Sequence, residues 1–127
     1  MDPRGEWLRL LGLLEHMIQE SERPVAQKLF RGLGVRRLRM AQRQLRRERQ
    51  ALLVAGARWN LAIEPDDVFQ SSRALALCDD LAQDYLAVAE AYRRAASIAE
   101  QRGDPTLMRW MALRARMHIE HSRFLQG

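Results

Sequence analysis

Residues 71–99 read SSRALALCDDLAQDYLAVAEAYRRAASIA, and this stretch decides the fold class. Its apolar and small residues recur at alternating spacings of four and three, which is typical of a helix that packs along another helix at a shallow angle. The many alanines allow a neighbouring helix to approach closely. We therefore predict one long helix here, with a packing face made of Ser71, Leu75, Cys78, Ala82, Tyr85, Ala89, Tyr92, Ala96 and Ala99.

Helix start signals on either side of this stretch divide the rest of the chain. Before it, Glu64-Pro65-Asp66-Asp67 indicates a loop and a helix start, because carboxylates favour the positive N-terminal end of a helix. After it, Asp104 is placed to cap the last helix and Pro105 to open it. This last helix is expected to reach about Leu125, and two earlier helices are expected from about Glu6 to Ser21 and from Val35 to about Leu61.

The sequence contains no strand signal, and it predicts an all-α protein. Short connections between long amphipathic helices favour antiparallel neighbours, so we expect an up-down four-helix bundle formed by one domain, residues 1–127. A hydrophobic content of 47% supplies a core without a metal or disulfide. Whether Gly32-Leu33-Gly34 breaks the second helix stays open.

Cysteine usage and hydropathy suggest where the chain resides. Cys78 is the single cysteine, so no intrachain disulfide can form, and a buried, unreactive thiol fits a reducing compartment. No segment approaches the roughly 20 uninterrupted apolar residues that a membrane-spanning helix needs. A cytoplasmic location is therefore predicted, with no membrane span.

Three segments in the last third of the chain carry a family resemblance. They are AEAYRRAA at residues 89–96, GDPTL at 103–107 and HIEHSRFL at 118–125. Residues 80–125 resemble the ferritin-like superfamily, specifically its rubrerythrin-type four-helix proteins. The resemblance implies a centre of two iron or manganese ions, held by two carboxylates and two Glu-x-x-His pairs that project into the bundle.

The residues at those ligand positions depart from the family pattern. The last pair reads His118-x-x-His121, with a histidine in place of the glutamate, and the third-helix ligand would fall near Asp84 or Tyr85. The second helix around Glu48 contains no histidine. Because a two-metal centre needs several carboxylates to balance its charge, we expect that the oxidase chemistry is absent and that no cofactor is bound.

The two histidines of the last helix nevertheless remain candidate site residues. The apolar face expected for this helix consists of Trp110, Leu113, Met117 and Phe124, and His121 falls near its middle. One interpretation is a buried polar cluster that forms a metal site, an anion pocket or a pH-sensitive latch. In the metal interpretation, His118 and His121 would bind the ion with a carboxylate such as Asp84, Glu90 or Glu48.

The other interpretation is structural, and we favour it. Buried polar groups need hydrogen-bond partners, which Tyr85, Tyr92 or a backbone carbonyl could provide for these histidines. Arg114 lies beside the same face and would repel a metal cation, and no inward-facing carboxylate is evident from the pattern.

Arginine dominates residues 36–49, RRLRMAQRQLRRER, in a chain with a net charge of +5. The helical period places several arginines opposite Leu38, Leu45 and Leu52. Such a face could bind an acidic protein or nucleic-acid phosphates, but no aromatic residue interleaves the arginines and no recognised nucleic-acid-binding module is present. A solvated face that pairs with Glu48 and other neighbours is a third interpretation. The face consists of Arg36, Arg39, Arg43, Arg46 and Arg47.

Function is predicted mainly from what these patterns omit. No Gly-rich phosphate loop, nucleophile elbow or zinc-ligand spacing occurs, so no catalytic residue and no enzymatic activity are predicted. The leading hypothesis is a non-catalytic helical-bundle protein that works through protein–protein contacts, by self-association or as an adaptor or regulatory subunit. The alternatives are ferritin-like metal binding at His118 and His121, and nucleic-acid binding through the Arg36–Arg49 face.

Overall fold

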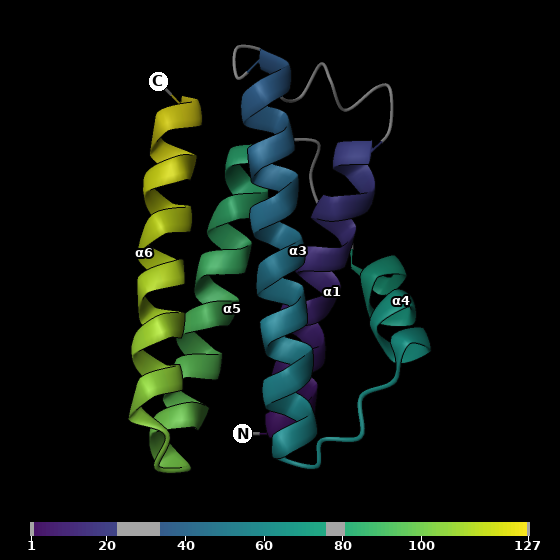
Figure 1. Ribbon diagram of the computed structural model, residues 1–127, viewed down its shortest axis with the longest axis vertical. Coiled ribbons are helices and arrows are strands. Elements are labelled where there is room, and N and C mark those ends of the chain that lie inside the picture. The colour runs from purple at the N-terminus through teal and green to yellow at the C-terminus, as the bar shows by residue number, and fades with distance from the viewer. Residues whose placement is uncertain (1, 23–33, 76–80, 127) are drawn as a thin grey trace.

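The computed structural model describes residues 2–22, 34–75 and 81–126, and within them the chain is all-α. Five helices of the described residues pack together: four long ones lie roughly along one axis, and a short one lies against α1 (Figure 1). The helices are α1 (Pro3–Glu22), α3 (Gly34–Arg58), α4 (Pro65–Ala74), α5 (Leu81–Gln101) and α6 (Pro105–Gln126).

No described helix combines the length and the apolar character that crossing a lipid bilayer requires.

The two helix starts predicted from proline and acidic residues are confirmed. Helix α4 begins at Pro65, and the Asp67 carboxylate accepts a hydrogen bond from the Glu64 backbone N–H at 2.9 Å. Helix α6 begins at Pro105, and the Asp104 carboxylate accepts one from a backbone N–H of the first turn at 3.1 Å. Both carboxylates thus satisfy backbone donors at helix starts that the helix itself leaves without partners.

The prediction of one helix through residues 71–99 is wrong. Helix α4 ends at Ala74, because Leu75 adopts an extended conformation (φ −85°, ψ 117°). The residues after it, including Cys78, lie outside the described part, and so do Gly32 and Leu33, where a break in the second helix was left open. The error has a physical reason: periodicity does not show whether a helix is continuous, because two helices joined by a short connection can carry the same period.

Helix α4 reverses the direction of the chain between α3 and α5, so these two long helices run the same way (Figure 1). In Figure 1, α4 carries the chain back along the bundle axis, so α3 and α5 run one way while α1 and α6 run the other. The α5 part of the predicted packing face is confirmed, since all six of its members are buried: Ala82, Tyr85, Ala89, Tyr92, Ala96 and Ala99.

Helix α1 is covered on more than one side. It packs against α3 and α5 and also against α4, and it buries four leucines completely: Leu10, Leu11, Leu13 and Leu14. At Gly12 the α1 and α4 backbones come so close that a Cβ atom would lie 2.5 Å from Ser71 Oγ and 3.1 Å from the Ser71 backbone carbon. Ser71 also donates a hydrogen bond to the Leu8 carbonyl at 3.0 Å.

Replacing Gly12 with alanine is therefore expected to destabilise the protein. The new methyl group must push α4 away, and overpacking of this kind costs about 1–3 kcal/mol, more than the roughly 1 kcal/mol that alanine gains over glycine in a helix. Gly5→Ala in the same helix is the control, because Gly5 is exposed and the nearest neighbours of a Cβ atom there belong to the exposed side chain of Asp2, whose Oδ2 would lie 2.7 Å away and can rotate aside. Urea unfolding followed by circular dichroism should show a loss for G12A only, and equal stability of the two variants would contradict the close approach.

The core face of α6 also differs from the predicted one. Its buried residues are Met111, Ala115, His118 and Ser122, whereas Leu113, Met117 and Phe124 are 47%, 45% and 61% exposed. Two interleaved stripes compete in this sequence, one residue apart. The stripe with the smaller side chains faces α5, where Ser122 Oγ donates to the Ala82 carbonyl at 2.7 Å. The larger apolar residues are left at the surface.

Candidate functional site

A carboxylate lies in the centre of the helical packing. Glu48 of α3 is fully buried, and its Oε1 accepts a hydrogen bond from the Tyr92 hydroxyl of α5 at 2.7 Å. The same oxygen lies 2.6 Å from Nε2 of His118 on α6. These three residues, the Glu48 cluster, join three helices through side chains that are buried. The second carboxylate oxygen of Glu48, Oε2, makes no hydrogen bond with any described residue.

The burial of Glu48 contradicts the interpretation in which this residue pairs with the arginines of a solvated face. The sequence does indicate that Glu48 is buried, because it follows Leu45 by three residues and precedes Leu52 by four. Both leucines are buried. The helical period therefore places its side chain on the apolar stripe of α3. The statement that no inward-facing carboxylate is evident was wrong for the same reason.

Four aromatic rings form a stacked column beside this carboxylate. Tyr85 stacks on His121 at 4.6 Å between ring centroids and on His118 at 5.4 Å, and His118 stacks on Tyr92 at 5.7 Å. Helices α5 and α6 thus alternate along the column. The predicted hydrogen bonds from the histidines to the tyrosines are replaced by ring stacking, since the polar atoms of His118 and Tyr92 both point to Glu48.

The two histidines differ in their surroundings. His118 is buried, whereas His121 is only half-buried, so the prediction that His121 lies mid-face in the core is wrong. Partial burial, and then the charges of His118 and Arg37, lower the pKa of His121 below its ordinary value of 6.5. His121 is therefore a neutral ring near pH 7, and it lies at the outer end of the column.

The two tyrosines of the chain are both in this column, and both hold their protons strongly. Burial first, and then the charge of Glu48, raise the pKa of Tyr85 above its ordinary value of 10.0. The same two causes and the hydrogen bond to Glu48 raise the pKa of Tyr92 as well. Arg114 opposes this shift at Tyr92 without overcoming it.

These pKa directions predict a loss of stability in alkali. In the unfolded chain the tyrosines ionise near pH 10, whereas in the folded chain they stay protonated to higher pH. The unfolded state therefore binds fewer protons, and the stability that is fully present below about pH 10 falls as the pH rises further, by at most about 1.4 kcal/mol per pH unit for each tyrosine.

Phenolate absorbance measures this directly, because the chain has only these two tyrosines. We expect the absorbance to rise near pH 10 in denaturant, but in native buffer only as the helical circular dichroism is lost. Tyr85→Phe and Tyr92→Phe should each flatten the alkaline slope. Ionisation near pH 10 with the helices intact would contradict the burial of these hydroxyl groups.

The Glu48 cluster does not fit a two-metal centre. Among the described residues, no group of three or more histidine, cysteine, aspartate or glutamate side chains is arranged to hold a metal ion. Glu48 and His118 supply two donors, while His121 stacks on the far side of Tyr85. Metal binding at His118 and His121 stays a prediction.

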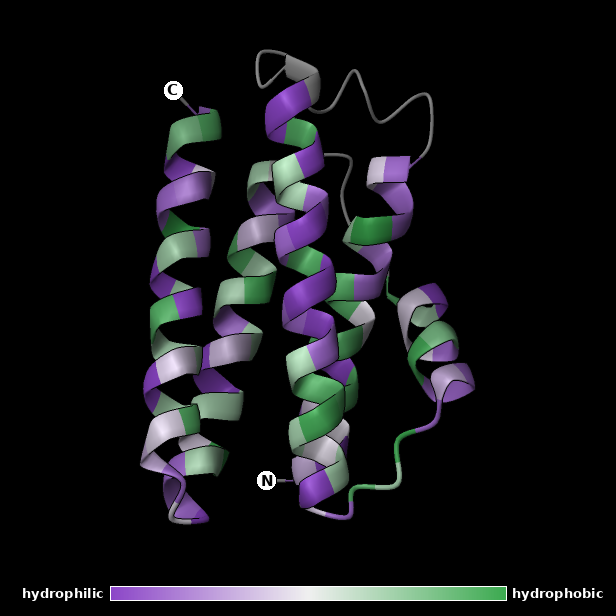
Figure 2. Cartoon of the chain, viewed as in Figure 1, coloured by the Kyte–Doolittle hydropathy of each residue, from purple (hydrophilic) through white to green (hydrophobic). Residues whose placement is uncertain are grey.

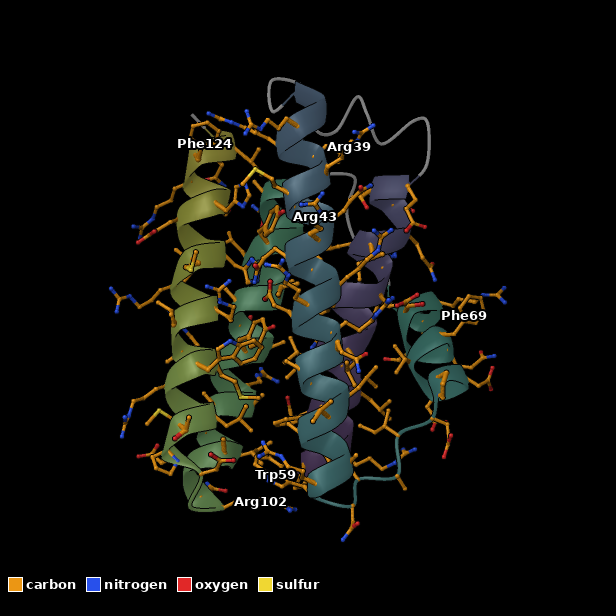
Figure 3. All side chains as sticks on the ribbon, viewed as in Figure 1. Arg39, Arg43, Trp59, Phe69, Arg102 and Phe124 are labelled. Carbon is orange, nitrogen blue, oxygen red and sulfur yellow. The ribbon has the colours of Figure 1, made fainter. Side chains whose placement is uncertain are left out.

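A groove with a volume of about 590 Å³ lies between α3 and α6, and we call it the α3/α6 groove. Its exposed apolar residues are Met40, Met117 and Phe124, the last with the Arg37 guanidinium 5.7 Å from its ring centroid. Figure 3 shows Phe124 near the end of α6, beside the first turns of α3. Arg43 and Arg47 also line the groove, and none of the described residues in its lining is an aspartate or glutamate.

The five arginines of the predicted face do not all lie on the same side of α3. Its five members are all exposed, but only Arg43 and Arg47 line the groove, together with Arg37, which the prediction left out. Arg46 instead pairs with Glu22 of α1, on the other side of α3. Figure 2 shows that the hydrophilic residues gather in the first half of α3 and the hydrophobic ones in the second. The nucleic-acid hypothesis stays a prediction.

Comparison with protein-family models, curated proteins and solved structures finds no match to this chain. The ferritin-like resemblance of residues 80–125 therefore stays a prediction.

Proposed function

We propose that this protein is a non-catalytic helical bundle that works through protein–protein contacts, with the α3/α6 groove as its binding surface. In this proposal α1, α3, α5 and α6 form the four-helix frame, and α4 lies outside it. The observation that carries the proposal is the combination of exposed Met40, Met117 and Phe124 with arginines of the groove that form no ion pair with any described residue. Methionine, aromatic residues and arginine are enriched where proteins bind one another.

The Glu48 cluster supports a non-catalytic role. A reacting group must reach its substrate, whereas Glu48 and Tyr92 are fully buried and His118 is 4% exposed. Their hydrogen bonds join α3 to α5 and α6, so the cluster sets the separation of the helices that border the groove. It thereby fixes the shape of the proposed binding surface.

Site-specific photocrosslinking in the source cells tests this proposal. A benzophenone amino acid at Met40 lies at the groove, whereas the same group at Phe69 is the control on the exposed side of α4 (Figure 3). We expect covalent adducts of a reproducible protein, identified by mass spectrometry, at position 40 only. The adducts should disappear when Arg43 and Arg47 are changed to glutamate. The same adducts at both positions, or none at position 40, would contradict the proposal.

A further inference from the structure

The α3/α6 groove also indicates what kind of segment it would bind, an inference that rests on the function proposed above. We propose that the occupant is an acidic, amphipathic α-helix of about three turns, supplied by a partner protein. Its apolar side would contact Met40, Met117 and Phe124, and its carboxylates would lie among Arg37, Arg43 and Arg47.

The shape of the groove favours a helical segment over a small molecule. The groove is open and bordered by two antiparallel helices, so a small ligand in it would keep much of its surface in water, whereas small-ligand sites bury most of their ligand. From Arg37 to Arg47 the α3 side covers about three helical turns, or roughly 15 Å. A partner helix of similar length would lie along it, as amphipathic helices do in hydrophobic grooves.

The apolar side chains suit such a helix. Met40 and Phe124 are each 61% exposed, and Met117 is 45% exposed, so all three retain surface that a partner can cover. They come from both walls of the groove, which allows anchors spaced three or four residues apart on the partner to contact α3 and α6 in turn. Flexible methionine side chains adapt to different anchors.

The positive charge of the groove favours a partner segment that is negatively charged. Arg37, Arg43 and Arg47 line it, none of them has a described ion pair, and the described lining residues include no carboxylate. A partner carrying aspartate and glutamate would complement this charge. A second copy of this chain is disfavoured, because two such grooves facing each other would bring six arginines together in a protein of net charge +5.

Nucleic acid and anionic membranes share the negative charge but match the groove less well. A phosphate backbone gains nothing from the apolar walls that Met40, Met117 and Phe124 provide. A flat bilayer cannot follow a concave surface between two helices. Binding of duplex DNA or of anionic vesicles is therefore measured alongside peptide binding.

Selection from a displayed library of random 14-residue peptides tests the chemistry of the occupant. The whole protein serves as bait, with depletion on the Arg43→Glu/Arg47→Glu variant. We expect enriched peptides with a clear excess of aspartate and glutamate, apolar residues three or four apart, and a gain of helicity on binding. Fluorescence anisotropy should show at least about tenfold weaker binding to R43E/R47E. The charge-matched control Arg93→Glu/Arg109→Glu, exposed and outside the groove lining, should bind normally.

Other outcomes would overturn this inference. Enriched peptides that are basic, uncharged or non-helical would do so. So would binding of duplex DNA or phosphatidylserine vesicles through Arg43 and Arg47 when no peptide is enriched. The photocrosslinking result separates the two proposals: adducts at position 40 without acidic helical peptides leave the protein-binding function standing and refute only the acidic helix.

Discussion

Replacing His118 with alanine is expected to lower the free energy of unfolding by about 3–5 kcal/mol, because it removes one of the two hydrogen-bond partners of a fully buried carboxylate. Glu48 would keep only the Tyr92 hydroxyl as a hydrogen-bond partner, because its Oε2 makes no hydrogen bond with any described residue. The loss of the imidazole also leaves a cavity between Tyr85 and Tyr92, which stack on its two sides. Urea unfolding followed by far-ultraviolet circular dichroism measures the change.

A double-mutant cycle with Glu48→Gln separates these two causes. Glutamine keeps the volume and an acceptor for the Tyr92 hydroxyl but carries no charge, so H118A should cost clearly less in the E48Q background than in the wild type. The difference between the two costs measures the coupling of His118 to the buried charge. Equal costs in both backgrounds would show that His118 contributes by packing alone.

Replacing Trp7 with alanine is expected to cost a similar amount, about 3–5 kcal/mol. Trp7 is fully buried, its ring lies 4.9 Å from that of Trp59, and its indole N–H donates to the Leu52 carbonyl at 3.0 Å. The alanine variant loses both the packing of a large side chain and the partner of a buried carbonyl. Because α1 contacts three other helices, the cavity weakens the entire core.

Trp7→Phe is the matched control, because it keeps an aromatic ring but loses the indole N–H. We expect it to cost about 1–2 kcal/mol, the range for one buried hydrogen bond plus a small cavity. The same urea titration gives both values. If W7A lost no more stability than W7F, Trp7 would not be a core residue and the position of α1 would be wrong.

Local signals were enough to predict some elements of this fold. Pro65 and Asp104 identify their helix starts because capping and proline geometry act within one turn. The face of α5 was also predictable, since Tyr85, Tyr92 and the alanines between them keep one period throughout. The all-α class follows from such signals repeated along the chain.

Other features depend on partners that are distant in sequence. Glu48 is separated by 44 residues from Tyr92 and by 70 from His118, so nothing near it indicates that its charge has partners in the core. The choice between two stripes on α6 depends on the small side chains of α5, which favour Ala115 and Ser122 over Met117 and Phe124. The apolar lining of the α3/α6 groove exists because Ala115 and Ser122 face the core and the larger Met117 and Phe124 stay outside it.

The coverage of α1 by three helices has a consequence during synthesis on the ribosome. Helix α1 leaves the exit tunnel before α3, α4 and α5, but its four fully buried leucines pack in a core that those helices complete, and α5 ends at Gln101. At ordinary translation rates the interval is on the order of ten seconds. Throughout it the nascent chain presents a leucine-rich helix of the kind that chaperones hold. The apolar face of α1 is therefore exposed until α5 has been made.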